Sequence, residues 1–370
     1  MKVLGIVNFE DDSVKIDGLG DYRPVPAVSF MGRYRIIDVI LSNMTNSGID
    51  NVHVYCKEKP RNLFDHLGDG SMYNINSKRG KLRILYGEKP FSSPVYNTDI
   101  ANFMLNMQYI EEDPNPYVLI APSYFVYNFD FNEAFNAHVE SGADITVLYT
   151  STNDANTKFL SCDVIQMDKE KRILSFEKNR GKSKNRQVSM EAYILSKALF
   201  IQLIKQAANV SSLYWFKDIL HDQVNELVIK GYGVRGYVAC IDSLSAFYKV
   251  AMELKNLKNA EALFKEDRPI YTQTNDSSPT RYTSDACVKE SIIANGCLIE
   301  GTVEGSIIGR NVTIKEGAYV KDSIIMTDAV IDKDAKLEYV VVDKYAIVHH
   351  IKKLVGSEDS PVYVKRRDRI

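Results

Sequence analysis

The sequence predicts two architectures in one chain: an α/β domain built on a mostly parallel sheet, followed by a β-helix of hexapeptide repeats. Short apolar runs alternate with segments of helical periodicity as far as about residue 240. A polar, turn-rich stretch follows at 272–280, and beyond it aliphatic residues recur every six positions. A chain of 370 residues also exceeds the size of one average domain, so we expect two domains.

The first part of the chain reads as buried strands alternating with amphipathic helices. The strand-like apolar runs lie at 2–7, 52–56, 117–121 and 144–149. The segments with apolar residues at helical spacing lie at 34–47, 99–111 and 131–140. Strands that alternate with helices indicate βαβ units and a doubly wound, mostly parallel sheet. Ligands of such sheets bind beyond the carboxyl ends of the strands, so we expect the functional site there.

The domain boundary falls where the periodicity changes. We assign residues 1–242 to the α/β domain and residues 285–370 to the β-helix. Residues 243–284 form the connection between them, which begins with an expected helix at 243–259 and ends in the polar, turn-rich stretch.

Aliphatic residues mark the repeats of the second domain. Those six positions apart include Ile293 and Ile299; Ile308, Ile314 and Val320; Ile325, Ile331 and Leu337; and Val341 and Ile347. The triplet Ser-Ile-Ile begins at 291, 306 and 323, at intervals of 15 and 17 residues. A period of six is neither that of an α-helix nor that of a strand. It is typical of a hexapeptide β-helix with aliphatic side chains stacked inside, and a few β-hairpins with chance spacing are the alternative.

Charge and composition exclude several classes of function. The formal net charge of −2 argues against a nucleic-acid partner, which needs clustered positive charge. No apolar run approaches the roughly 20 residues of a membrane span, and the strand-like N-terminus does not resemble a signal peptide. The five cysteines are scattered without metal-ligand spacing, so we expect no metal site and a cytoplasmic location.

Three motifs resemble those of a known enzyme family. The stretch R-P-V-P-A-V-S-F-M-G-R-Y-R-I-I-D at 23–38, continuing to L-S-N at 41–43, resembles R-A-K-P-A-V-x-F-G-G-x-x-R-I-I-D-x-x-L-S-N of glucose-1-phosphate adenylyltransferase. F-E-K at 176–178 is similar to the family's F-V-E-K-P, and S-M-E-A-Y at 189–193 is similar to its S-M-G-I-Y. The resemblance runs along the whole chain. It implies a Rossmann-like nucleotidyltransferase domain followed by a left-handed β-helix.

The loop that holds the triphosphate in this family is altered. The family's reaction joins ATP and glucose 1-phosphate and releases pyrophosphate, so Mg²⁺ and cations must neutralise several phosphate oxygens. Family members use a glycine-rich loop after the first strand, because glycine lets backbone N–H groups close on phosphate. Residues 8–16 here contain no glycine and carry three consecutive acids at 10–12, and Val25 replaces the lysine of R-A-K-P.

Both metal-binding aspartates implied by the resemblance are replaced. The family's G-D-H-x-Y corresponds to residues 123–127, where Tyr124 takes the place of the aspartate. Its S-H-D-F-G-K-D corresponds to residues 212–218, where Tyr214 does the same. A neutral phenol is a poor ligand for Mg²⁺, which prefers carboxylate oxygens. We therefore expect no catalytic residues and no cofactor in this chain, with Mg²⁺ bound only by a catalytic partner.

Other residues match the family's binding motifs. Glu177, Lys178 and Ser189 match its sugar-phosphate residues and predict a vestigial site, although Lys178 reads equally well as a solvated surface lysine. Arg33, Arg35 and the basic C-terminal tail are candidate contacts for a phosphorylated effector, which the resemblance places between the two domains.

These replacements remove residues that bind phosphate and metal, and they leave the motifs of the structural scaffold in place. We therefore expect a regulatory or structural subunit that joins a catalytic paralogue in a heterotetramer for glycogen biosynthesis. The alternative is a weakly active enzyme that recruits Asp38, Asp130 or Asp218 to a rearranged metal site. A hexapeptide acyltransferase is disfavoured, because the repeats offer no histidine base between His221 and His349.

Overall fold

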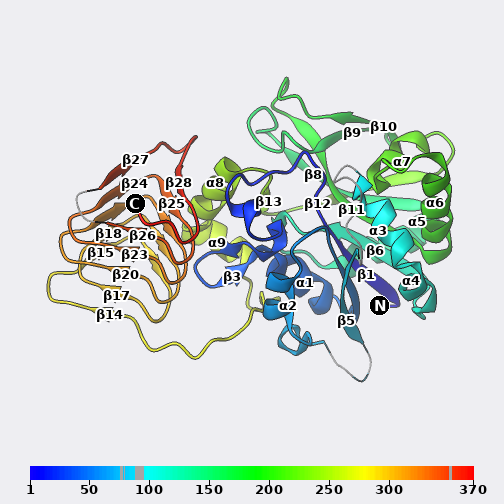
Figure 1. Ribbon diagram of the computed structural model, residues 1–370. Coiled ribbons are helices and arrows are strands. Elements are labelled where there is room, and N and C mark those ends of the chain that lie inside the picture. The colour runs from blue at the N-terminus through cyan, green and yellow to red at the C-terminus, as the bar shows by residue number, and fades with distance from the viewer. Residues whose placement is uncertain (76–77, 79, 88–95, 350–351) are drawn as a thin grey trace.

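The computed structural model describes residues 1–75, 78, 80–87, 96–349 and 352–370. Figure 1 shows an α/β domain beside a β-helix, with α8 (Leu244–Leu254) and α9 (Leu257–Leu263) between them. Within the described residues, no helix combines the length and the apolar content needed to cross a bilayer.

A single mixed sheet forms the centre of the α/β domain. Among the described residues it has nine strands, in the order β10-β9-β11-β6-β1-β4-β5, with β8 pairing β11 and β12 pairing β8. The strands are β1 (Val3–Asn8), β4 (Asn51–Cys56), β5 (Lys81–Tyr86), β6 (Tyr117–Pro122), β8 (Ile145–Thr152), β9 (Asp163–Met167), β10 (Ile173–Lys178), β11 (Arg186–Ser196) and β12 (Ile229–Val234). Strands β6, β1, β4 and β5 are parallel, and β11 runs antiparallel to β6 and β8. The predicted α/β fold is confirmed.

Side chains along the central strands alternate between two apolar cores. On β1, Leu4 and Ile6 face one core and Val3 and Val7 face the other. The helices are α1 (Ile36–Asn46), α2 (Arg61–Leu67), α3 (Asp99–Leu105), α4 (Met107–Glu112), α5 (Phe131–Ser141), α6 (Lys197–Val210) and α7 (Phe216–Asp222). Helices α3, α4, α6 and α7 contribute to the core of Leu4, and α1, α2 and α5 to the core of Val3. Layers of helices on both faces are what a doubly wound sheet requires.

One predicted helix is divided. The segment predicted at 99–111 contains α3 and α4, which are separated at Asn106. The side chain of Asn106 donates a hydrogen bond to the carbonyl oxygen of Asn102 at 3.0 Å, which lets its backbone leave the helical conformation.

The second domain is a left-handed β-helix, as predicted. In the described part of the chain it has three parallel sheets of five strands. The first sheet contains β14 (Arg281–Tyr282), β17 (Leu298–Ile299), β20 (Thr313–Ile314), β23 (Val330–Ile331) and β26 (Ile347–Val348). The second contains β15 (Cys287–Lys289), β18 (Thr302–Glu304), β21 (Tyr319–Lys321), β24 (Lys336–Glu338) and β27 (Lys353–Val355). The third contains β16 (Ile292–Ile293), β19 (Ile307–Ile308), β22 (Ile324–Ile325), β25 (Val340–Val342) and β28 (Val362–Val364).

The Ser-Ile-Ile triplets explain the register of the third sheet. Their isoleucines pair directly, Ile292 with Ile307 and Ile307 with Ile324. The hydroxyls of Ser291 and Ser306 each accept the backbone N–H of the serine in the next coil at 3.0 Å, which stacks Ser291, Ser306 and Ser323 in a ladder. The coils begin with β14, because Arg281 and Tyr282 pair with β17. These two residues lie before residue 285, where the aliphatic pattern becomes regular, and they do not follow that pattern.

Several polar contacts join the two domains. The hydroxyl of Tyr248 on α8 donates to the carbonyl oxygen of Asp322 at 2.7 Å, and Nζ of Lys255 donates to that of Gly305 at 2.7 Å. Arg23 forms an ion pair with Asp343 in which both side chains are almost completely buried. These contacts fix the β-helix against the α/β domain.

Candidate functional site

The candidate site lies at the carboxyl ends of the parallel strands. β1 ends at Asn8 and is followed by the loop that carries Asp11, and β6 ends at Pro122, two residues before Tyr124. This edge is where doubly wound sheets bind their ligands. The structure therefore places the altered phosphate loop and one replaced aspartate at the same edge of the sheet.

Four side chains fill this site with interactions of their own. Lys217, in the first turn of α7, forms an ion pair with Asp11, and its Nζ lies 3.6 Å from Oε1 of Glu191. The other oxygen of Glu191 accepts a hydrogen bond from the Tyr124 hydroxyl at 2.7 Å. The three charged side chains are only 13–14% exposed, so solvent screens them weakly. We call Asp11, Tyr124, Glu191 and Lys217 the Lys217 network.

Lys217 and Asp11 stabilise each other's charge, whereas burial raises the pKa of Glu191. Burial alone lowers the pKa of Lys217, but the carboxylates of Glu191 and Asp11 outweigh burial and raise that pKa. Burial raises the pKa of Asp11, but the charge of Lys217 and hydrogen bonds from Lys217 and Ser13 outweigh it, so the pKa is lowered. Lys217 is therefore protonated, and its charge is neutralised by carboxylates of the chain itself.

Glu191 was not identified from the sequence, although a signal was present. It stands where the family's S-M-G-I-Y motif has glycine, and its φ of 51° lies in the left-handed region that favours glycine. The pairing of β11 with β8 shifts between Ser189 and Ala192, so the chain bulges at this residue. A β-bulge re-aims side chains. The retained backbone shape thus carries a carboxylate into the site.

Tyr214 lies in different surroundings from Tyr124. Its hydroxyl donates to Asp222 at the end of α7, at 2.5 Å, and the side chain is partly exposed. Burial and the nearby Glu191 raise the pKa of Tyr124, whereas the hydrogen bond to Asp222 raises that of Tyr214. The two replaced positions therefore bind two different carboxylates, and only Tyr124 belongs to the Lys217 network.

All three residues of the predicted sugar-phosphate site form hydrogen bonds within the chain. Nζ of exposed Lys178 donates to the carbonyl oxygen of Ser161 and lies 3.5 Å from the Ser13 hydroxyl. Glu177 accepts a hydrogen bond from Gln166 at 2.8 Å. Buried Ser189 accepts the backbone N–H of Glu191 at 3.2 Å. Lys178 thus reaches the loop after β1, while Ser189 supports the bulge on β11.

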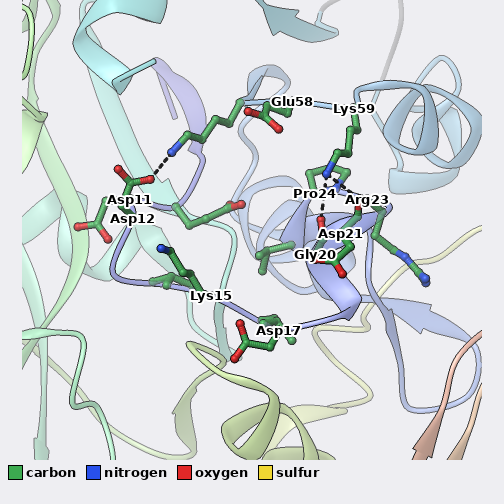
Figure 2. Close-up of a pocket in the computed structure, with 15 residues that line it drawn as sticks. Asp11, Asp12, Lys15, Asp17, Gly20, Asp21, Arg23, Pro24, Glu58 and Lys59 are labelled. Carbon is green, nitrogen blue, oxygen red and sulfur yellow. Dashed lines mark hydrogen bonds and ion pairs between the residues drawn. The ribbon is translucent and has the colours of Figure 1, made fainter. Parts of the chain in front are cut away.

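An acidic pocket of about 320 Å³ opens beside the loop after β1. Figure 2 shows Asp11, Asp12 and Lys15 along one side and Asp21 and Lys59 on the other. Among the described lining residues, acidic side chains outnumber basic ones by six to four. Three of the four cations have partners within the chain: Lys57 pairs with Asp12 at 2.7 Å, Lys59 donates to the carbonyl oxygen of Asp21 at 2.7 Å, and Arg23 pairs with Asp343. The pocket therefore offers a polyphosphate few unpaired cations.

The carboxylates considered for a rearranged metal site cap helices instead. Asp38 and Asp218 accept the backbone N–H groups three residues before them, at 2.8 and 3.0 Å. Asp130 accepts the N–H two residues after it at 3.0 Å. Asp38 is also 2.6 Å from both the Tyr73 hydroxyl and Nε2 of His66. In the part of the chain that the structure describes, no group of three His, Cys, Asp or Glu side chains is placed to hold a metal ion. The residues do not fit the Mg²⁺ site that the resemblance implies.

A second charged region lies between the domains. Arg35 donates from Nη1 to the carbonyl oxygen of Asn62 at 2.6 Å, whereas Arg33 is exposed and lies over the Tyr34 ring. Lys344 of the β-helix is partly buried, and its pKa falls to about 7 because of burial and the charges of Arg35 and Arg23. Arg366 adds to this positive charge. We call Arg23, Arg35, Lys344 and Arg366 the interdomain cation cluster.

Known families match both parts of the chain. Residues 16–234 match the family described as Nucleotidyl transferase, and residues 278–360 match that described as GlmU-like, C-terminal hexapeptide.

Full-length relatives are also similar to this chain. It is 34% identical over 322 residues to "Glycogen biosynthesis protein GlgD" of Geobacillus stearothermophilus, which covers 86% of this chain and 83% of that protein. Identity to the protein of the same name from Bacillus subtilis is 28% over 367 residues, covering 99% of this chain and 96% of that protein. Identity to "Glucose-1-phosphate adenylyltransferase" of Bacillus anthracis is 29% over 329 residues, covering 87% and 86%. This protein therefore belongs to the nucleotidyl transferase family, in the group that contains glucose-1-phosphate adenylyltransferases and GlgD proteins.

Proposed function

We propose that this chain is a non-catalytic regulatory subunit of glucose-1-phosphate adenylyltransferase and serves glycogen biosynthesis. The relatives named for glycogen biosynthesis and for the adenylyltransferase support the pathway and the reaction of its partner. The observation that carries the non-catalytic role is the Lys217 network, in which two carboxylates hold the lysine at the edge where nucleotide phosphates would approach.

The charge balance of the site opposes nucleotidyl transfer. Transfer to ATP brings several phosphate oxygens together and needs cations aimed at them. Here Lys217 is neutralised internally, and Tyr124 supplies a neutral phenol in place of a metal-binding carboxylate. Losing several kcal/mol of such stabilisation lowers a rate by about 10³-fold or more. In this proposal, Mg²⁺ and turnover belong to the partner subunit.

The N-terminal end of the β-helix supports association with that partner. Strands β14, β15 and β16 are the edges of their sheets, and the interior-facing Val288 and Ile293 are only partly buried. At the other end the backbone at 368–370 hydrogen-bonds to Ile347 and His349, so the edge strand β26 is covered there, whereas β14 at the first end has no such cover among the described residues. An apolar, open sheet edge favours pairing with another chain. We assign this end to contact with the catalytic subunit, within a heterotetramer.

The interdomain cation cluster supports binding of a phosphorylated effector. Among the described residues, Nε of Arg366 and Nη1 of Arg23 are buried without a hydrogen-bond partner, and Nζ of Lys344 makes no hydrogen bond or ion pair. Unpaired buried donors are costly, and an anion would satisfy them. Because the cluster joins residues of both domains, an anion there would favour one arrangement of the domains over another and so couple binding to the partner's activity.

Co-expression with the catalytic subunit of the same organism tests the proposal. We expect the two chains to co-purify and the complex to release pyrophosphate with a changed kcat or KM compared with the catalytic chain alone. Val288→Asp should abolish co-purification, and Val355→Asp, at an exposed position at the opposite end of the β-helix, should not. Failure of the wild-type chains to associate, or unchanged kinetics in a stable complex, would contradict the proposal.

A further inference from the structure

Two buried thiols are in contact behind the candidate site. Sγ of Cys162 lies 3.7 Å from Sγ of Cys240, although the residues are 78 positions apart in the sequence. Cys162 is 1% exposed and immediately precedes β9, and Cys240 is 7% exposed and ends β13 (Val238–Cys240). Among the described residues, no other pair of cysteines makes such a contact.

A cavity leads to one of these thiols. It measures about 510 Å³ and is lined by Cys240, by Ser13 and Lys178 near the candidate site, and by one face of α8 including Lys249. Cys162 is not among its lining residues. A small molecule that enters the cavity therefore reaches Cys240 first, with Cys162 directly behind it.

We propose that Cys162 and Cys240 form a reversible disulfide when hydrogen peroxide enters this cavity. The Cys240 thiolate attacks one peroxide oxygen, the O–O bond breaks, and Cys240 becomes a sulfenic acid while hydroxide takes up a proton as water. Cys162 then attacks the Cys240 sulfur, which forms the S–S bond and releases a second water. Two thiols are oxidised by two electrons, and one peroxide is reduced to two waters.

The geometry requires a small rearrangement. A disulfide has an S–S length of about 2.05 Å, so the sulfurs must approach by about 1.7 Å from their present 3.7 Å. Burial raises the pKa of the Cys240 thiol, which keeps most of it protonated and makes the reaction slow at neutral pH.

The disulfide would fasten segments that hold the Lys217 network. The residue before Cys162, Ser161, accepts a hydrogen bond from Lys178 and donates one to Asp242 at 2.6 Å. The residue after Cys240, Ile241, donates its backbone N–H to the carbonyl oxygen of Tyr124 at 2.8 Å. Oxidation thus links the loop before β9 to the segment that positions Tyr124.

Thiol counting on the purified chain tests this inference. The native protein is treated with excess hydrogen peroxide, denatured, alkylated and digested for mass spectrometry. We expect alkylated cysteines to fall from five to three, a peptide containing both Cys162 and Cys240, and full reversal by dithiothreitol. The melting temperature should rise by roughly 5 °C on oxidation, because the cross-link closes a long loop.

Single variants distinguish the roles of the two thiols. Cys162→Ala should leave a sulfenic acid on Cys240 that reacts with dimedone, and Cys240→Ala should give no such adduct. Cys297→Ala, which removes another buried thiol, should still form the cross-link. Five free thiols after peroxide treatment, or loss of thiols only at cysteines other than Cys162 and Cys240, would overturn the inference. Peptide mapping of the wild-type chain shows which cysteines are linked, so it tests the inference even if a variant fails to fold.

Discussion

Lys217 and Lys344 are both partly withdrawn from solvent, but they face opposite surroundings. Lys217 lies between the carboxylates of Asp11 and Glu191, which raise its pKa. Lys344 lies among arginines, and burial together with the charges of Arg35 and Arg23 lowers its pKa to about 7. The first lysine is neutralised by the chain, whereas the second has, among the described residues, only the carboxylate of Asp343 nearby, which is already paired with Arg23.

This difference separates two kinds of anion site. A cation that already has two carboxylates gains little from a phosphate, because the phosphate must displace them against their negative charge. A crowded group of cations gains much, because an added anion relieves their repulsion. In the proposed function, the nucleotide edge is closed to phosphates and the domain boundary is receptive to them.

The largest effect should come from the ion pair that supports the interdomain cation cluster. Asp343→Ala leaves the buried Arg23 guanidinium without its partner, and Asp343 also accepts a hydrogen bond from Tyr363 at 2.8 Å. We expect the free energy of unfolding to fall by about 3–5 kcal/mol in urea titrations. Asp359→Ala removes the exposed partner of Lys249 and should leave stability unchanged. Equal effects of the two changes would contradict the importance of the buried pair.

The Lys217 network should show the next largest effect. Lys217→Met leaves Asp11 and Glu191 facing each other without a cation, so we expect a loss of about 2–3 kcal/mol in the free energy of unfolding at pH 7. Because the pair lowers the pKa of Asp11, its stabilisation is present above about pH 4 and is lost as the pH falls further. The wild type and variant should therefore converge in acid. Lys205→Met, at an exposed ion pair, is the matched control.

Lys344→Met should change the free energy of unfolding in the opposite direction and stabilise the protein. Since the pKa of Lys344 is lowered to about 7, the unfolded chain binds more protons between about pH 7 and pH 10. Wild-type stability should therefore rise across that range. The variant should be more stable than wild type by about 2 kcal/mol at pH 6.5 and no different at pH 10. Inorganic phosphate should raise the melting temperature of the wild type more than that of the variant. Equal responses to phosphate would count against an anion site at this cluster.

The smallest effects on stability should come from the two positions where tyrosine replaces the family's aspartates. Tyr124→Phe removes a buried hydrogen bond to Glu191 and should cost about 1 kcal/mol of unfolding free energy. Tyr214→Phe removes a hydrogen bond at a partly exposed position and should leave stability unchanged. If Tyr214→Phe proves the more harmful change, Tyr214 rather than Tyr124 lies at the centre of the site.

Local patterns made the fold predictable. The alternation of strands and helices identified the parallel core around β1, and the Ser-Ile-Ile triplets marked one sheet of the β-helix, because hydroxyl ladders and paired isoleucines repeat with each coil. The break at Asn106 was not predicted, since apolar spacing continues across it while its side chain bonds the backbone.

Within the site, only the absence of the family's catalytic residues could be predicted from the sequence. The replaced aspartates and the glycine-free loop are visible in aligned motifs. The interactions that replace them join residues far apart, such as Asp11 and Lys217, which are 206 positions from each other. No periodicity encodes such a pair, and the direction of Glu191 depends on a bulge in β11. The contact of Arg23 with Asp343 likewise follows from how the two domains meet.

Pyrophosphate release by the purified chain alone, with Mg²⁺, ATP and glucose 1-phosphate, tests the central claim most directly. If the carboxylates that hold Lys217 exclude the triphosphate, release should not exceed that of the uncatalysed mixture, with or without added effector. Sustained release that disappears in Lys217→Met would show that this lysine serves phosphate, and would contradict the account.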